Sequence, residues 1–148
     1  MFEDIFTNVK GKVRVPQVRD LGGVYPPHRI IQTDDAWEIL SRWEIDDVGA
    51  SYLGGTWTVR IFAEAMGPGA DKELAKAEVD LSAVAALPLP RQYEYLFEIP
   101  AFDVNPAKGL EPGVYKLVTV VNYANGGFPL EMAGFREGPI IQIYEEGN

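Results

Sequence analysis

The sequence predicts an all-β protein, an antiparallel β-sandwich of about seven strands preceded by an extended arm. From residue 36 onward, apolar side chains recur at every second position, the period that places alternate side chains on opposite faces of a strand. Short stretches rich in Gly, Pro and Asp separate these segments, and such stretches are typical of turns. Six or seven strands with this spacing favour two packed antiparallel sheets.

The length of the chain fits a single folded domain. It has 148 residues, of which 47% are hydrophobic and 24% charged, values typical of a globular protein with one ordinary core. We expect residues 1–33 to form the extended N-terminal arm and residues 34–148 to form the β-sandwich.

The segment 36–46 could be a strand or a helix. Its large apolar side chains alternate with polar ones, and they are Trp37, Ile39, Trp43 and Ile45. The alternative is a helix that begins with a capping box formed by Asp35 and Glu38. The strand is favoured because Trp and Ile suit pleated surfaces and Leu40 is the one large apolar residue out of phase.

Five later segments are also predicted to be strands. They cover residues 56–64, 75–81, 92–99, 113–123 and 139–146. The fourth is apolar on both faces, which predicts a central strand. Pro139 is expected at the start of the last strand, where a missing N–H costs least. Residues 82–87 are rich in Ala, and a short helical turn is an alternative there.

The stretch Leu110-Glu-Pro112-Gly113-Val-Tyr115, followed by a long apolar strand, resembles the turn before the penultimate strand of immunoglobulin-like and fibronectin type III-like sandwiches. The resemblance implies that Tyr115 hydrogen-bonds to upstream backbone and locks this corner. It also implies that Trp57 is the core tryptophan. We expect Trp37 and Trp43 to join Trp57 and Tyr115 in the structural core. No functional residues transfer with a resemblance of this kind.

The charge of the chain is unevenly distributed. The net charge is −9, yet residues 1–33 contain five basic and three acidic residues. A strongly acidic chain is a poor partner for nucleic acid, whose binding depends on Lys and Arg at the phosphates. Within the arm, Arg14, Arg19 and Arg29 are expected to contact carboxylates of the sandwich, and Tyr25 is expected among the arm's contacts.

The arm is interrupted by Pro16, Pro26, Pro27 and Gly22-Gly23, so it cannot form a continuous helix or a central strand. Its many Val and Ile residues would be costly to leave in water. Three alternatives remain open: the arm wraps its own domain, it docks on a neighbouring subunit, or it is a mobile linker.

No catalytic motif is present, and we expect a protein that is not an enzyme. The chain has no cysteine and a single histidine, His28, for which the sequence nominates no partner. No serine lies in a nucleophile-elbow sequence. Asp46, Asp47 and Asp103 are weak candidate ligands for Ca²⁺, which prefers six to eight oxygen ligands, but their spacing matches no known calcium loop. No other cofactor is indicated.

We therefore expect a non-enzymatic protein-interaction or assembly module. We expect it to form homo-oligomers through its arm, so its partner is a protein, in the first instance another copy of the same chain. The alternative is a module that binds Ca²⁺ or carbohydrate through loops at one end of the sandwich. The sequence has no apolar run of the length that a signal peptide or a membrane span requires, so we expect a cytoplasmic protein without membrane or nucleic-acid partners.

Overall fold

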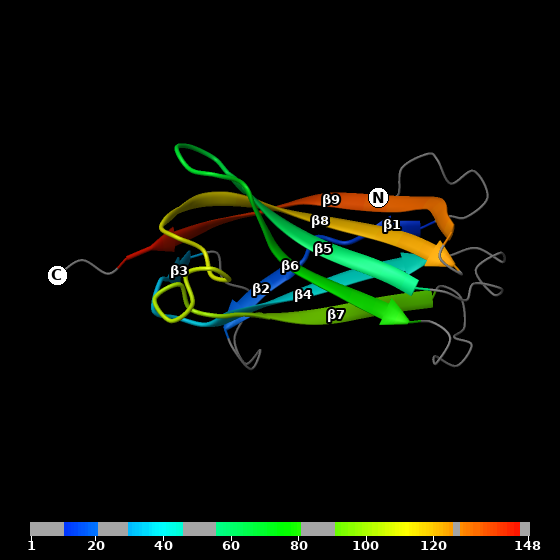
Figure 1. Cartoon of the computed structure of the whole chain (residues 1–148), viewed down its shortest axis with the longest axis horizontal. Coiled ribbons are helices and arrows are strands. Elements are labelled where there is room, and N and C mark those ends of the chain that lie inside the picture. The colour runs from blue at the N-terminus through cyan, green and yellow to red at the C-terminus, as the bar shows by residue number, and fades with distance from the viewer. Residues whose placement is uncertain (1–10, 21–29, 46–55, 81–90, 126–127, 146–148) are drawn as a thin grey trace.

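The computed structural model describes residues 11–20, 30–45, 56–80, 91–125 and 128–145, and in this part of the chain it contains nine strands and no helix. The strands form two sheets packed face to face (Figure 1). The prediction of an all-β sandwich is confirmed. In chain order the strands are β1 (Gly11–Val13), β2 (Gln17–Asp20), β3 (Ile30–Gln32), β4 (Trp37–Ile45), β5 (Thr56–Ala65), β6 (Lys72–Asp80), β7 (Arg91–Ile99), β8 (Gly113–Asn125) and β9 (Phe128–Tyr144).

The smaller sheet is built around β4. This strand pairs with β7 on one side and with β1 and β2, placed end to end, on the other, and all three pairings are antiparallel. Trp37, Ile39 and Trp43 are all buried on its inner face. The helix alternative for residues 36–46 is wrong, since Trp37–Ile45 is a strand. Residues two positions apart share one face on a strand but not on a helix, so Trp37 and Ile39 are buried together.

The larger sheet has the order β3-β9-β8-β5-β6. Its middle strand is β8, as its apolar residues on both faces predict. The pairing of β3 with β9 is parallel, which departs from the predicted antiparallel arrangement. Because β3 follows a crossing from the smaller sheet to the larger one, no hairpin dictates its direction. Figure 1 shows β3 at the end of the molecule that also carries the end of β9.

The arm explains why the described strands number nine rather than about seven. Six strands lie from residue 37 onward, and the other three, β1, β2 and β3, lie within the arm. The first two extend the smaller sheet and the third extends the larger one. The described part of the arm therefore wraps its own domain, and its residues Val13, Val18 and Ile31 are buried in the core.

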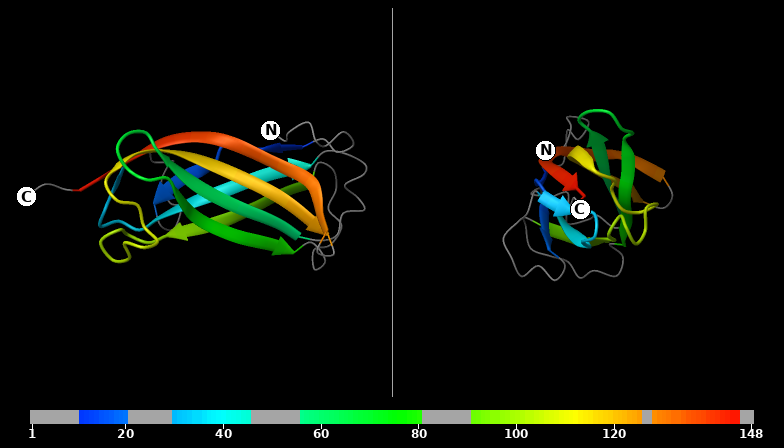
Figure 2. Two further views of the ribbon diagram at one scale, coloured as in Figure 1. Left: turned by 45° about the horizontal axis from the view of Figure 1, so that its top comes forward. Right: turned by 90° about the vertical axis from the view of Figure 1, so that its left-hand side faces the viewer.

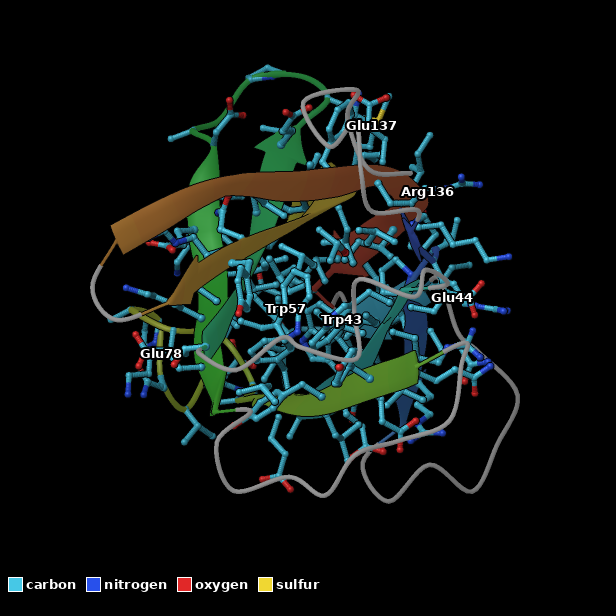
Figure 3. All side chains as sticks on the ribbon, turned by 90° about the vertical axis from the view of Figure 1, so that its right-hand side faces the viewer. Trp43, Glu44, Trp57, Glu78, Arg136 and Glu137 are labelled. Atoms are coloured by element: carbon cyan, nitrogen blue, oxygen red, sulfur yellow. The ribbon has the colours of Figure 1, made fainter. Side chains whose placement is uncertain are left out.

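Aromatic side chains join the two sheets in the interior. The ring centroids of Trp43 on β4 and Trp57 on β5 are 6.2 Å apart in an edge-on arrangement, and Figure 3 shows the two side chains between the sheets. Tyr93 stacks on Trp43 at 5.8 Å, and Tyr123 lies 5.1 Å from Trp57. Such pairs add about 0.5–1.5 kcal/mol each beyond the area that they bury. The end-on view in Figure 2 shows the two layers that this cluster connects.

The last strand differs from the sequence prediction at Pro139. The proline was expected where the strand begins, but β9 begins at Phe128 and Pro139 lies within it. Glu137 pairs with Val118 and Ile140 pairs with Lys116, so β9 holds one residue more than β8 between these pairs. The extra residue forms a β-bulge at Gly138-Pro139. Gly138 has a φ of 103°, and a bulge needs no ladder hydrogen bond from the proline nitrogen.

Tyr115 lies at the start of β8 and is 4% exposed. Its hydroxyl donates a hydrogen bond of 2.9 Å to the carbonyl oxygen of Glu111, four residues upstream. This is the contact that a tyrosine corner makes. Burial, with the nearby charge of Glu111, raises the pKa of the Tyr115 hydroxyl, so the neutral, donating form is maintained.

The tyrosine corner can be tested by Tyr115→Phe. The substitution leaves the carbonyl of Glu111 without this donor, and we expect it to lower the free energy of unfolding by about 1 kcal/mol. Urea denaturation measures the change. Tyr95→Phe is the control, because Tyr95 is 38% exposed. Equal stability losses in the two variants would contradict a structural role for the Tyr115 hydroxyl.

Candidate functional site

The outer face of the larger sheet carries a group of apolar side chains, which we call the apolar patch. The pairing register places the patch residues of β8 between those of β5 and those of β9. Val114, Phe135 and Ile140 are 43, 43 and 47% exposed. The patch consists of Phe62, Val114, Val118, Val120, Phe135 and Ile140.

Strand alternation and the bulge in β9 together produce the patch. In β8, Tyr115, Leu117 and Val121 point into the core, so the alternate valines face outward. Phe135 and Ile140 are five positions apart, and in a regular strand they would lie on opposite faces. The bulge at Gly138-Pro139 brings both to the outer face, where they pair opposite Val120 and Lys116 of β8.

Charged side chains of both signs lie among and beside the apolar side chains of the patch. The ammonium of Lys116 lies 3.4 Å from Glu64 and 3.3 Å from Glu137, so one cation joins β5, β8 and β9. Its hydrogen bond to Glu137 raises the pKa of the Lys116 ammonium. On β5, Arg60 lies 3.6 Å from Glu73 of β6. Figure 3 shows Glu137 at the edge of the molecule, away from the interior tryptophans.

The predicted arm contacts lie at the opposite sheet. Arg19 Nε is 3.3 Å from Oε1 of Glu38, although the two atoms are not aligned for a hydrogen bond. Arg14 Nη2 donates to Oε2 of Glu44 at 3.3 Å, and Lys12 Nζ lies 2.9 Å from Oε1 of the same carboxylate. The arm's cations therefore meet the acidic residues of β4. Arg29 and Tyr25 lie outside the described residues.

The two carboxylates of β4 are buried even though they point away from the core. Glu38 is 2% and Glu44 is 9% exposed, and the side chains of Arg19, Lys12 and Arg14 lie against them. The hydrogen bond from Lys12, with that from Arg14, holds the pKa of the Glu44 carboxyl below its usual value despite the opposing effect of burial. Sequence alternation alone identified these residues only as members of the polar face.

Of the weak calcium candidates, only Asp103 lies in the described part of the chain. Asp103 accepts a hydrogen bond of 3.3 Å from the hydroxyl of Thr33, whereas Asp46, Asp47 and His28 lie outside the described residues. Within the described ranges, no three His, Asp or Glu side chains form a group that could hold a metal ion.

A hollow of about 300 Å³ lies at the end of the sandwich, between the β5–β6 turn and the β7–β8 connection. Lys72 reaches across this end and donates to the carbonyl of Gly109 at 2.7 Å. Asp71 accepts a 2.9 Å hydrogen bond from the backbone N–H of Ala65. Both charged side chains are thus used to hold the loops together.

No protein-family model matches this chain, and no curated protein is significantly similar in sequence. Among solved structures, the chain is similar to the C-terminal domain of Wzt, with a TM-score of 0.57 and 14% identity over 93% of this chain and 75% of that one. That domain is an immunoglobulin-like β-sandwich. The resemblance predicted from the sequence is confirmed at the level of the fold.

Two further structures are less similar. A CARDB domain from Pyrococcus furiosus, solved in complex with di-metal ions, has a TM-score of 0.49 and 10% identity over 93% of this chain and 96% of that one. A β-glucosidase from Erythrobacter marinus has a TM-score of 0.49 and 11% identity over 92% of this chain but 16% of its own. These likenesses concern the fold alone. Among the described elements, none is a helix long and apolar enough to cross a membrane.

The ion pair between the arm and β4 can be tested by Arg19→Ala. This change leaves the buried carboxylate of Glu38 without its cation, and we expect a loss of about 3 kcal/mol in the free energy of unfolding. Arg60→Ala is the matched control, since its pair with Glu73 is largely exposed and is worth less than about 1 kcal/mol. If urea denaturation shows that the two variants lose the same free energy of unfolding, Arg19 does not act by compensating a buried charge.

A second test concerns the pH dependence of the Glu44 contacts. The lowered pKa of Glu44 means that its ion pairs stabilise the folded state above the usual pKa of 4.5 and are lost as the pH falls below that value. We expect Glu44→Gln to cost about 1 kcal/mol at neutral pH. The difference from the unsubstituted protein should shrink as denaturation is measured at progressively lower pH. A difference independent of pH would show that ionisation of Glu44 is not responsible.

Proposed function

We propose that this chain is a non-catalytic assembly module that forms a homodimer by packing its apolar patch against the apolar patch of a second copy. The observation that carries the proposal is the exposure of Val114, Phe135 and Ile140, each more than 40% accessible on one face of a sheet. Monomeric proteins rarely leave large contiguous apolar surfaces in water, and such surfaces mark sites of contact.

The charges beside the patch support a second copy as the occupant. The chain has a net charge of −9, so two copies repel each other over most of their surfaces. On the outer face of β5, β8 and β9, however, the described charged side chains balance, with Arg60 and Lys116 against Glu64 and Glu137. A face that carries both signs in equal number can meet its own copy without net repulsion, and a two-fold axis pairs each patch with itself.

The size of the face also fits this occupant. Strands β5, β8 and β9, which carry the patch, contain 10, 13 and 17 residues. At about 4.8 Å between strands and about 3.3 Å per residue, their outer face covers roughly 600 Å². Stable interfaces bury about 600–1,000 Å² on each partner, so this face reaches the lower end of that range.

This arrangement differs from assembly through the arm. The described arm strands β1 and β2 pair with β4, and β3 pairs with β9, all within one chain. Their backbone groups are already used in these ladders, so a dimer formed through the patch leaves the arm in place.

The proposal is tested by the double substitution Phe135→Glu and Ile140→Glu. Each glutamate replaces an exposed apolar side chain, so the fold should survive, but four like charges would meet in the dimer. We expect sedimentation velocity to give twice the chain mass for the unsubstituted protein and the mass of one chain for the variant. The control is Val104→Glu, which adds the same kind of charge at a residue that is 82% exposed outside the patch, and it should remain dimeric.

Two results would refute the proposal. One is an unsubstituted protein that sediments with the mass of one chain at every concentration examined. The other is a double variant that stays dimeric while circular dichroism shows it to be folded.

A further inference from the structure

A second candidate site lies where the arm passes between the two sheets. A cavity of about 470 Å³ opens there, and a neighbouring hollow of about 380 Å³ continues over the outer face of β4 and β7. We call the first cavity the basic cleft. Its lining residues are Lys12, Val13, Arg14, Val15, Arg42 and Arg136.

The pairing register brings these cations together from three parts of the chain. Val13 pairs with Trp43, and the backbone N–H of the next residue, Arg14, donates to the carbonyl of Arg42 at 2.9 Å. Arg14, which directly follows β1, therefore lies next to Arg42 of β4. Arg136 comes from β9, which passes beside β1. Figure 3 shows Arg136 and Glu44 on the same side of the molecule, beside the blue N-terminal strands.

The charge of this region is opposite to that of the whole chain. Among the residues that the structure describes, the cleft and the adjoining hollow contain four cationic side chains and two carboxylates, Glu44 and Glu94, which gives a formal charge of +2 in a chain of −9. Lys12 and Arg14 are bound to Glu44. Placing like charges side by side is unfavourable unless an anion compensates them, and the local carboxylates compensate only half of the positive charge.

Two of the guanidinium groups are not used within the described part of the protein. Arg42 and Arg136 make no ion pair or side-chain hydrogen bond with any residue that the structure describes. The Nε of Arg42 is also buried without a hydrogen-bond partner in these residues. A buried donor without an acceptor is unfavourable, and more so when it is charged. An oxyanion in the cleft would supply acceptors for the terminal guanidinium nitrogens of Arg42 and Arg136.

We propose that the basic cleft binds a small phosphomonoester. The formal charge of +2 matches a phosphate dianion, and a tetrahedral phosphate can accept hydrogen bonds from guanidinium groups that approach from different strands. A planar carboxylate has two oxygens and fewer directions of approach. The cavity volume lies at the lower end of the range for small-molecule sites, and the half-buried side chain of Val15 provides an apolar wall for the organic part of the ligand.

The basic cleft and the apolar patch share β9 but lie on opposite faces of it. Arg136 pairs with Thr119, whose side chain is buried, whereas Phe135 pairs with Val120 on the outer face. Ligand binding and dimer formation are therefore separate properties, and either can fail without the other.

The test is calorimetric titration at low ionic strength with two probes, inorganic phosphate and phenyl phosphate. We expect both to bind, phenyl phosphate more tightly because its ring meets the apolar wall, and both more weakly as salt is added. Arg42→Gln and Arg136→Gln should each weaken binding by about tenfold or more, the loss of one charge-assisted hydrogen bond. Arg136→Gln changes an exposed side chain, so it tests the site even if Arg42→Gln does not fold.

The matched control is Arg60→Gln, which removes one positive charge from the outer face of the larger sheet and should leave the affinity unchanged. Benzoate is the matched carboxylate probe and should bind more weakly than phenyl phosphate. The proposal is overturned if neither phosphate probe binds, if benzoate binds as tightly as phenyl phosphate, or if folded Arg136→Gln keeps full affinity. An equal loss of affinity in Arg60→Gln would also overturn the proposal, because the affinity would then depend on the net charge of the chain and not on the cleft.

Discussion

The smaller sheet depends on the pairing of β4 with the arm. Without β1 and β2, this sheet would consist of β4 and β7 alone, and a two-stranded ribbon is marginally stable. The arm adds backbone hydrogen bonds along the free edge of β4 and contributes the buried side chains of Val13 and Val18. It also brings Arg19 and Arg14 to Glu38 and Glu44, so the two acidic residues of β4 can be buried with compensating charges.

The same constraint gives the two sheets different outer surfaces. The arm needs cations to meet the carboxylates of β4, and this requirement concentrates positive charge at one edge of an acidic protein. The outer face of the larger sheet has no such covering among the described residues, and its central strand is apolar on both sides. A charged cleft and an apolar face thus result from how the strands are distributed between the sheets.

A single inserted residue shapes the larger of these surfaces. The bulge at Gly138-Pro139 changes the face to which the following side chains point, which is the usual structural effect of a bulge. It places Phe135 and Ile140 on one side while Ile141 and Ile143 still point into the core. Without the extra residue, either the exposed apolar surface or the packing of the end of β9 would be lost.

The sequence by itself determined the six strands from β4 to β9, the inward direction of Trp37, Trp43 and Trp57, and the corner at Tyr115, because alternation and turn residues act over a few neighbouring positions. Only the tertiary structure decided that β3 runs parallel to β9, that the arm covers β4, and that the patch and the cleft form. These features depend on which strands become neighbours and in which register. Residues distant in the chain set that pairing jointly, so no local pattern encodes it.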